Sequence, residues 1–185
     1  MIETHPFGQY VPPKAKKLII GSFPCYSAVH KSYGQWFYEG SGKNLFWRLL
    51  GEVFDHPFTT LADKKLLCQQ HEIALTDILL QITRRQWERN RCADSNLMIQ
   101  QINLEGIHHC LKAPITHIFF TSKLVAQLFQ QHFSTVSLPT FTLPSPSPAA
   151  NRAIGSLKDY QQQKEAGLVS DTYTYRLKIY KKVLL

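Results

Sequence analysis

Short runs of consecutive apolar residues constrain this fold most strongly, because they lack the polar alternation of a strand that faces water on one side. Leu18–Ile20 ends at Gly21, and Ile118–Phe120 has the same uninterrupted character. Such runs are typical of strands that are buried within a sheet. From these runs and their bounding turn residues, four strands are predicted: Lys17–Ser22, Ile73–Asp77, Thr116–Thr121 and Ser137–Leu143.

Apolar residues at helical spacing occupy the segments between and after these strands. Helices are predicted at Asn44–Phe54, Thr60–Gln70, Asn96–Leu111 with a break at Gly106, Ser122–His132 with Ser122 as its cap, and Asp171–Leu185. The last helix places Tyr173, Leu177, Tyr180 and Leu184 on one face, which indicates docking onto the body of the protein. Strands that alternate with helices predict a single α/β domain over residues 1–185. Its expected architecture is a three-layer α/β/α sandwich with a central, mainly parallel four-stranded sheet.

The composition narrows the class of protein further. With 185 residues, 44% of them hydrophobic, one domain can bury a sufficient core without a disulfide or a metal. The apolar runs are too short for a membrane span and the N-terminus lacks the pattern of a signal peptide, so we expect a cytoplasmic protein. The four cysteines form no CxxC pair and the eight histidines form no HxH or HExxH pattern, so neither a metal site nor a cofactor is predicted.

Positive charge is concentrated in three parts of the chain, whose overall net charge is +8. Each of three clusters contributes a net +3: Lys14, Lys16 and Lys17; Arg84, Arg85, Arg89 and Arg91 with Glu88; and Arg176, Lys178, Lys181 and Lys182 with Asp171. Clustered positive charge on a nearly neutral body favours a polyanionic partner such as nucleic acid. The alternative is an ordinary solvated surface.

Two unusual loops follow the first and the fourth predicted strands, at the end of a parallel sheet where function gathers. The loop over residues 23–43 is rich in aromatic residues, and Pro144–Pro148 alternates proline with serine. Neither GxGxxG nor GxxxxGK[ST] follows the first strand, so a dinucleotide site or a P-loop is not expected. Aromatic rings beside amides and hydroxyls suit a planar ligand such as a nucleobase. The alternative is aromatic packing beneath a long loop.

Four motifs in these segments resemble the uracil-DNA glycosylase superfamily and occur in its order. They are Gly21-Ser22-Phe23-Pro24, Asn44-Leu45-Phe46-Trp47, Leu75-Thr76-Asp77-Ile78-Leu79 and Pro144-Ser145-Pro146-Ser147-Pro148 running on to Asn151. They are most similar to the hypoxanthine-DNA glycosylase-like branch. Two positions depart from the better-known branches: Phe23 stands where they carry Asp or Asn, and Leu143 stands where the uracil-specific branch has His.

The resemblance implies a monofunctional DNA glycosylase that flips a deaminated base out of DNA and hydrolyses its glycosidic bond in base excision repair. The base would be hypoxanthine, uracil or xanthine. Asn44 would position the water and Ser22 would help to stabilise the departing base, so both are candidate catalytic residues. Phe23, Tyr38 and Ser145 are candidates for binding the base. Tyr38 lies six residues before Asn44, one more than in the family, which implies an insertion.

DNA contacts are expected from the Ser/Pro loop and from the arginine-rich stretch after the second strand. The candidates are Ser147, Pro148, Asn151, Arg84, Arg85, Trp87 and Arg89. Asp77, at the end of a strand, is expected to be a capping or structural carboxylate. The expected partner is DNA, bound by a monomer. Two other functions stay open: a catalytically weak nucleic-acid-binding protein of the same fold, and an α/β enzyme that acts on free nucleosides or nucleotides.

Overall fold

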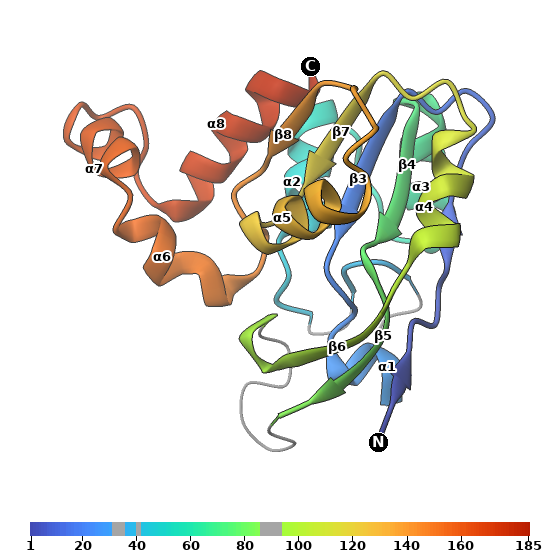
Figure 1. The fold of residues 1–185 in the computed structure, drawn as a ribbon. Coiled ribbons are helices and arrows are strands. Elements are labelled where there is room, and N and C mark those ends of the chain that lie inside the picture. The colour runs from blue at the N-terminus through green and yellow to red at the C-terminus, as the bar shows by residue number, and fades with distance from the viewer. Residues whose placement is uncertain (31–35, 40–41, 86–93) are drawn as a thin grey trace.

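The centre of the molecule is a sheet (Figure 1) that has five strands. The structure is a computed structural model, and it describes residues 1–30, 36–39, 42–85 and 94–185. The strands lie in the order β2-β4-β3-β7-β8. Their bounds are Gln9–Tyr10 (β2), Lys17–Gly21 (β3), Ile73–Asp77 (β4), His117–Phe120 (β7) and Thr140–Thr142 (β8). The last four of these strands are parallel, and β2 is antiparallel to β4.

The four predicted strands form the parallel part of this sheet, but the prediction of a four-stranded sheet was wrong. β2 adds an antiparallel edge, in which Gln9 pairs with Thr76 and Tyr10 with Leu75. Both residues of β2 are exposed or only partly buried, so the sequence has no apolar run there. They form a strand because the edge of β4 carries backbone groups that need hydrogen-bond partners.

A second, antiparallel sheet lies beyond the carboxyl end of β4 and has the strand order β1-β5-β6. Its strands are Glu3–Thr4 (β1), Leu79–Arg84 (β5) and Leu97–Ile102 (β6). The helix predicted over Asn96–Leu111 was therefore wrong in its first half, because β6 pairs with β5. Only α4 (Leu104–Leu111) is helical. It begins there because Asn103 caps it, with Oδ1 accepting a hydrogen bond from the Gly106 N–H.

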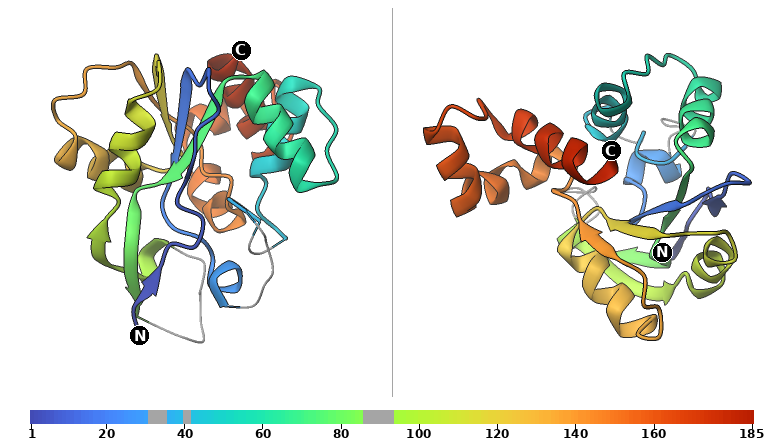
Figure 2. Two further views of the ribbon diagram at one scale, coloured as in Figure 1. Left: turned by 90° about the vertical axis from the view of Figure 1, so that its right-hand side faces the viewer. Right: turned by 90° about the horizontal axis from the view of Figure 1, so that it is seen from above.

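Helices cover both faces of the main sheet and make three layers (Figures 1 and 2). One face packs against α2 (Phe46–Phe54), α3 (Leu61–Gln70) and α8 (Thr172–Leu184), and the other against α4 and α5 (Lys123–His132). Leu18 and Ile20 of β3 belong to the core with α4 and α5, whereas Ile19 belongs to the core with α2 and α8. The uninterrupted apolar run thus reflects a strand that is buried on both faces. Ser122 caps α5 as predicted.

The chain ends in a group of helices that follows the Ser/Pro loop, and α6 and α7 stand off the sandwich (Figure 2). They are α6 (Asn151–Gly155), α7 (Lys158–Glu165) and α8. The predicted docking face of α8 is confirmed, because Tyr180 and Leu184 are buried against α2 and the sheet. The short elements are α1 (Tyr26–His30) and two 3-10 turns, Asp94–Asn96 and Pro148–Ala150. No helix within the described ranges is long and apolar enough to cross a membrane.

Candidate active site

A pocket of about 290 Å³ lies where β3, β4 and β7 end. Parallel strands end at the same edge of a sheet, so the residues that follow them meet there although they are far apart in sequence. Ser22 follows β3, Asp77 ends β4, and Thr121 follows β7; all three line the pocket. The volume is at the low end for ligand sites and suits a single small ring system rather than a large cofactor.

The pocket gathers every candidate catalytic and base-binding residue of the sequence analysis. Its lining includes Ser22, Phe23, Tyr38, Asn44 and Ser145. Ser147, expected to contact DNA, also lines the pocket, whereas Pro148 and Asn151 lie just beyond it and are exposed. The lining thus combines hydroxyls, an amide and aromatic rings. In the described part of the chain, no group of three or more His, Cys, Asp or Glu side chains is placed to hold a metal ion.

Asn44 is held just before α2 by a hydrogen bond from the first residue of that helix. Its Oδ1 accepts a hydrogen bond from the Phe46 N–H at 2.9 Å, which fixes the orientation of the amide. The next residue, Leu45, donates its N–H to the Pro146 carbonyl at 3.0 Å and ties this segment to the Ser/Pro loop. The Asn44 Nδ2 group makes no hydrogen bond with the described residues, so its two N–H donors remain for a ligand or a water molecule.

Tyr38 presents a buried hydroxyl at the pocket. Its ring stacks on Phe46 at a centroid distance of 3.8 Å, and its φ of 62° lies in the left-handed region, where a non-glycine residue is uncommon. The Oη atom has no hydrogen-bond partner among the described residues. Burial, together with the negative charge of Asp77, raises the pKa of this phenol well above its usual value, and the nearby Thr121 hydroxyl only partly opposes that rise, so the hydroxyl remains a neutral donor.

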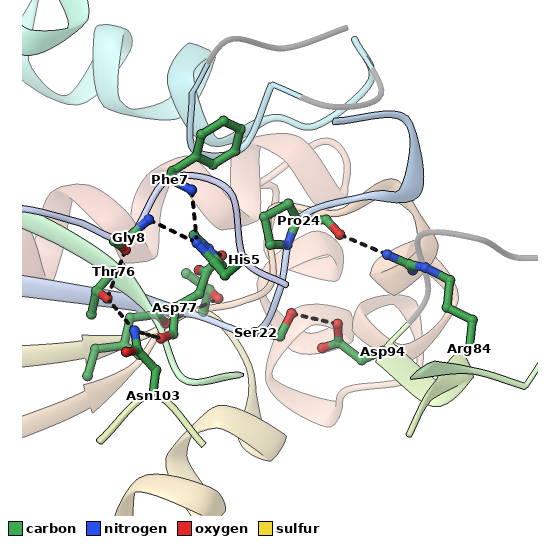
Figure 3. A network of polar contacts seen from close by, with 12 residues as sticks. His5, Phe7, Gly8, Ser22, Pro24, Thr76, Asp77, Arg84, Asp94 and Asn103 are labelled. Carbon is green, nitrogen blue, oxygen red and sulfur yellow. Dashed lines mark hydrogen bonds and ion pairs between the residues drawn. The ribbon is translucent and has the colours of Figure 1, made fainter. Parts of the chain in front are cut away.

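Asp77 is oriented by His5, a residue from the N-terminal arm that the sequence analysis did not single out (Figure 3). The His5 Nδ1 atom accepts hydrogen bonds from the N–H groups of Phe7 and Gly8, each at 3.2 Å. The ring proton therefore sits on Nε2 and is donated to Asp77 Oδ2 at 2.8 Å. Asp77 is more than the structural carboxylate expected from the sequence, because it also lines the pocket.

Asp94 is a second pocket carboxylate that sequence reasoning missed. Ser22 Oγ donates to Asp94 Oδ1 at 2.7 Å (Figure 3). Burial raises the pKa of Asp94 above the usual value of a carboxyl, the Ser22 hydrogen bond opposes that rise, and the negative charge of Asp77 adds to it. No sequence motif marks Asp94, because only the fold brings it to Ser22 across 72 residues.

Arg84 is a structural residue, so its prediction as a DNA contact was wrong. Its side chain is fully buried and forms a two-point ion pair with Glu3, with Nε–Oε1 and Nη2–Oε2 distances of 2.9 and 3.0 Å. Nη2 also donates to the Pro24 carbonyl at 3.1 Å. These contacts join β5 to the N-terminal arm and to the pocket wall. Arg85 is exposed, and the predicted contacts Trp87 and Arg89 lie outside the described residues.

Arg176 holds the Ser/Pro loop in place, although the sequence grouped it with the surface lysines of the last helix. It is fully buried. Its guanidinium donates to the carbonyls of Ser145 at 2.7 Å, Thr172 at 3.1 Å and Ser147 at 3.2 Å. The third basic cluster therefore contains a buried loop anchor as well as exposed lysines.

Replacing Gly21 by alanine is expected to lower the free energy of unfolding by about 2 kcal/mol. A Cβ at this position would overlap Asp77 Oδ1 and lie 2.6 Å from Tyr38 Oη, and Asp77 cannot turn away without losing His5. Urea denaturation measures the effect. Gly155→Ala is the matched control, because nothing lies within 4 Å of a Cβ there. Equal stability of the two variants would contradict the tight contact.

Comparison with models of known families and with curated proteins finds no match for this chain. Among solved structures, it is similar to the solution NMR structure of a "putative Uracil DNA glycosylase from Methanosarcina acetivorans". The two share 24% sequence identity with a TM-score of 0.65, over 90% of this chain and 96% of the other. The similarity thus extends over nearly the whole of both chains, which share the same fold.

Proposed function

We propose that this protein is a monofunctional DNA glycosylase of the uracil-DNA glycosylase superfamily, nearest to the hypoxanthine-excising branch. It would act as a cytoplasmic monomer that flips a deaminated base, hypoxanthine, uracil or xanthine, into the pocket and hydrolyses its C1′–N bond. The observation that carries the proposal is the pocket itself, which gathers residues from each of the four sequence motifs. The fold shared with a glycosylase-like protein supports it.

The chemistry of the pocket fits hydrolysis of an N-glycosidic bond. The base departs with the bonding electrons and the sugar becomes an oxocarbenium-like cation, so the greatest need is to stabilise the base. The hydroxyls of Ser145 and Tyr38 are donors at the pocket wall, whereas Ser22 donates its hydroxyl proton to Asp94. The cation reacts readily with water that is oriented rather than strongly activated, and the amide of Asn44 suffices for that role.

Contacts with DNA would come from the rim of the pocket. Pro148 and Asn151 are exposed beside it, and the anchoring of the Ser/Pro loop by Arg176 gives the loop a fixed shape before DNA binds. A preformed loop avoids the entropic cost of ordering on binding. Arg85, exposed at the end of β5, remains a candidate phosphate contact.

A panel of oligonucleotides tests the function directly. Duplexes and single strands that carry one hypoxanthine, uracil or xanthine are incubated with the protein, and abasic sites are revealed by alkaline cleavage. We expect cleavage at the damaged position in at least one substrate and none in undamaged DNA. Absence of cleavage with all three bases, accompanied by salt-dependent binding without preference for damage, would favour the catalytically weak binding protein instead.

One observation favours a second candidate, an enzyme that hydrolyses free nucleosides. The described lining of the pocket contains two carboxylates, Asp77 and Asp94, and no Lys, Arg or His, so no described cation of the pocket would pair with a phosphate. The two candidates are separated by comparing release of hypoxanthine from inosine with release from an oligonucleotide. A higher kcat/KM for inosine would replace the DNA glycosylase proposal.

A further inference from the structure

We propose that Asp94, held by Ser22, donates a proton to the departing base and so acts as the general acid of the pocket. The inference rests on the proposed function, since it assigns a role within base excision. It would make Asp94 a further catalytic residue, contributed by a segment that none of the four sequence motifs contains.

The two carboxylates of the pocket have different surroundings, which separates their roles. Asp77 accepts a hydrogen bond from the Nε2–H of His5 and lies against Gly21 and Tyr38. Asp94 receives its hydrogen bond from the neutral hydroxyl of Ser22. A carboxyl that is hydrogen-bonded to a hydroxyl through one oxygen can carry a proton on its other oxygen and donate it. Where two carboxyls differ in surroundings in this way, one can serve as the acid while the other stays ionised.

The surroundings of Asp94 raise its pKa and so shift the carboxyl toward its protonated form. Among the described residues, the groups that face it are Ser22 after β3, Asp77 at the end of β4, Ser122 at the start of α5, and Tyr38. Burial is the largest influence and raises the pKa of Asp94; the negative charge of Asp77 adds to that rise, and the hydroxyls of Ser22 and Ser122 oppose it by stabilising the ionised carboxylate. Within the described ranges, none of the groups that shift this pKa is cationic.

The step balances without any further reactant. The O–H bond of Asp94 breaks as an N–H bond forms on the departing base, and the electron pair of the C1′–N bond moves to the base. Water then adds to C1′ and returns its proton to the Asp94 carboxylate. The products are the free base and an abasic sugar, and the enzyme regains its starting state.

The test compares pH–rate profiles under single-turnover conditions, on the base that the wild-type protein excises best. General acids contribute roughly 10²–10⁴-fold to such rates, so Asp94→Asn is expected to lower the rate at acidic pH by about 10²-fold. The wild-type rate should fall as the pH rises through the pKa of Asp94, because the protonated form is lost. The ratio of wild-type to Asp94→Asn rates should therefore shrink with rising pH.

Ser22→Ala gives an independent readout that does not depend on the folding of Asp94→Asn. The Ser22 hydroxyl lowers the pKa of Asp94. Removal of this hydroxyl should therefore move the falling limb of the pH–rate profile to higher pH. A role of Asp94 in structure alone would leave the position of that limb unchanged.

Two outcomes overturn the proposal while leaving the glycosylase function intact. One is an active wild-type protein whose Asp94→Asn variant keeps the same rate, within threefold, and the same pH profile. The other is a pH–rate profile of Ser22→Ala whose falling limb lies at the same pH as that of the wild-type protein. A wild-type protein that excises no base in the panel removes the proposed function and this role together.

Discussion

Replacing Asn44 by alanine is expected to lower the single-turnover rate of base excision about 1,000-fold, within the range for a positioned proton-transfer or water-orienting group. The amide of Asn44 is fixed by the Phe46 N–H, and its two N–H donors at the pocket wall make no hydrogen bond with the described residues. On the proposed function, alanine removes the group that would hold the attacking water and leaves the outer surface unchanged. Affinity for damaged DNA, measured by fluorescence anisotropy at constant salt, should stay within threefold of wild type.

Asn44→Asp is the control for the structural part of this effect. A carboxylate oxygen can still accept the Phe46 N–H, so the start of α2 keeps this hydrogen bond, and such a bond is worth roughly 0.5–1.5 kcal/mol. The two N–H donors are lost and a third carboxylate joins Asp77 and Asp94. We expect stability near wild type with excision still strongly reduced. Equal losses of excision and DNA affinity in Asn44→Ala would remove Asn44 from the catalytic step.

Replacing Arg176 by alanine is expected to lower the free energy of unfolding by about 3–5 kcal/mol. The change removes three hydrogen bonds from a charged donor and leaves the carbonyls of Ser145, Thr172 and Ser147 without that partner. It also empties the volume of a fully buried side chain. Urea denaturation measures the loss, and excision should fall as well because the Ser/Pro loop forms part of the pocket.

Lys178→Ala is the matched control for Arg176→Ala. It removes one positive charge from the same helix at an exposed position, where substitutions usually change stability by no more than about 0.5 kcal/mol. A drop below 1 kcal/mol for Arg176→Ala, or an equal drop for both variants, would show that the buried contacts do not stabilise the loop.

The Ser/Pro loop shows how far local sequence reasoning reaches. Its prolines predicted a fixed loop, and its serines do line the pocket. Its anchor could not be predicted, because Arg176 looks like its neighbours Lys178 and Lys181 in a helical charge pattern. Burial distinguishes it, and burial depends on where the helix docks.

Strand prediction shows the same limit. β3 and β7 were predictable because strands covered on both faces need uninterrupted apolar residues. β2 and β6 were missed because their exposed or partly exposed residues are held by hydrogen bonds to a neighbouring strand. Such backbone pairing leaves little trace in side-chain pattern.

The sequence by itself determined the parallel centre of this fold and the residues of its four motifs, because both depend on local pattern and on chain order. Only the tertiary structure decided which charges act at the pocket. Arg84 belongs to a buried ion pair with Glu3, His5 orients Asp77, and Asp94 reaches Ser22 across the sheet edge. The physical reason is that the environment of a charge is set by burial and by neighbours distant in sequence, and these exist only once the chain has folded.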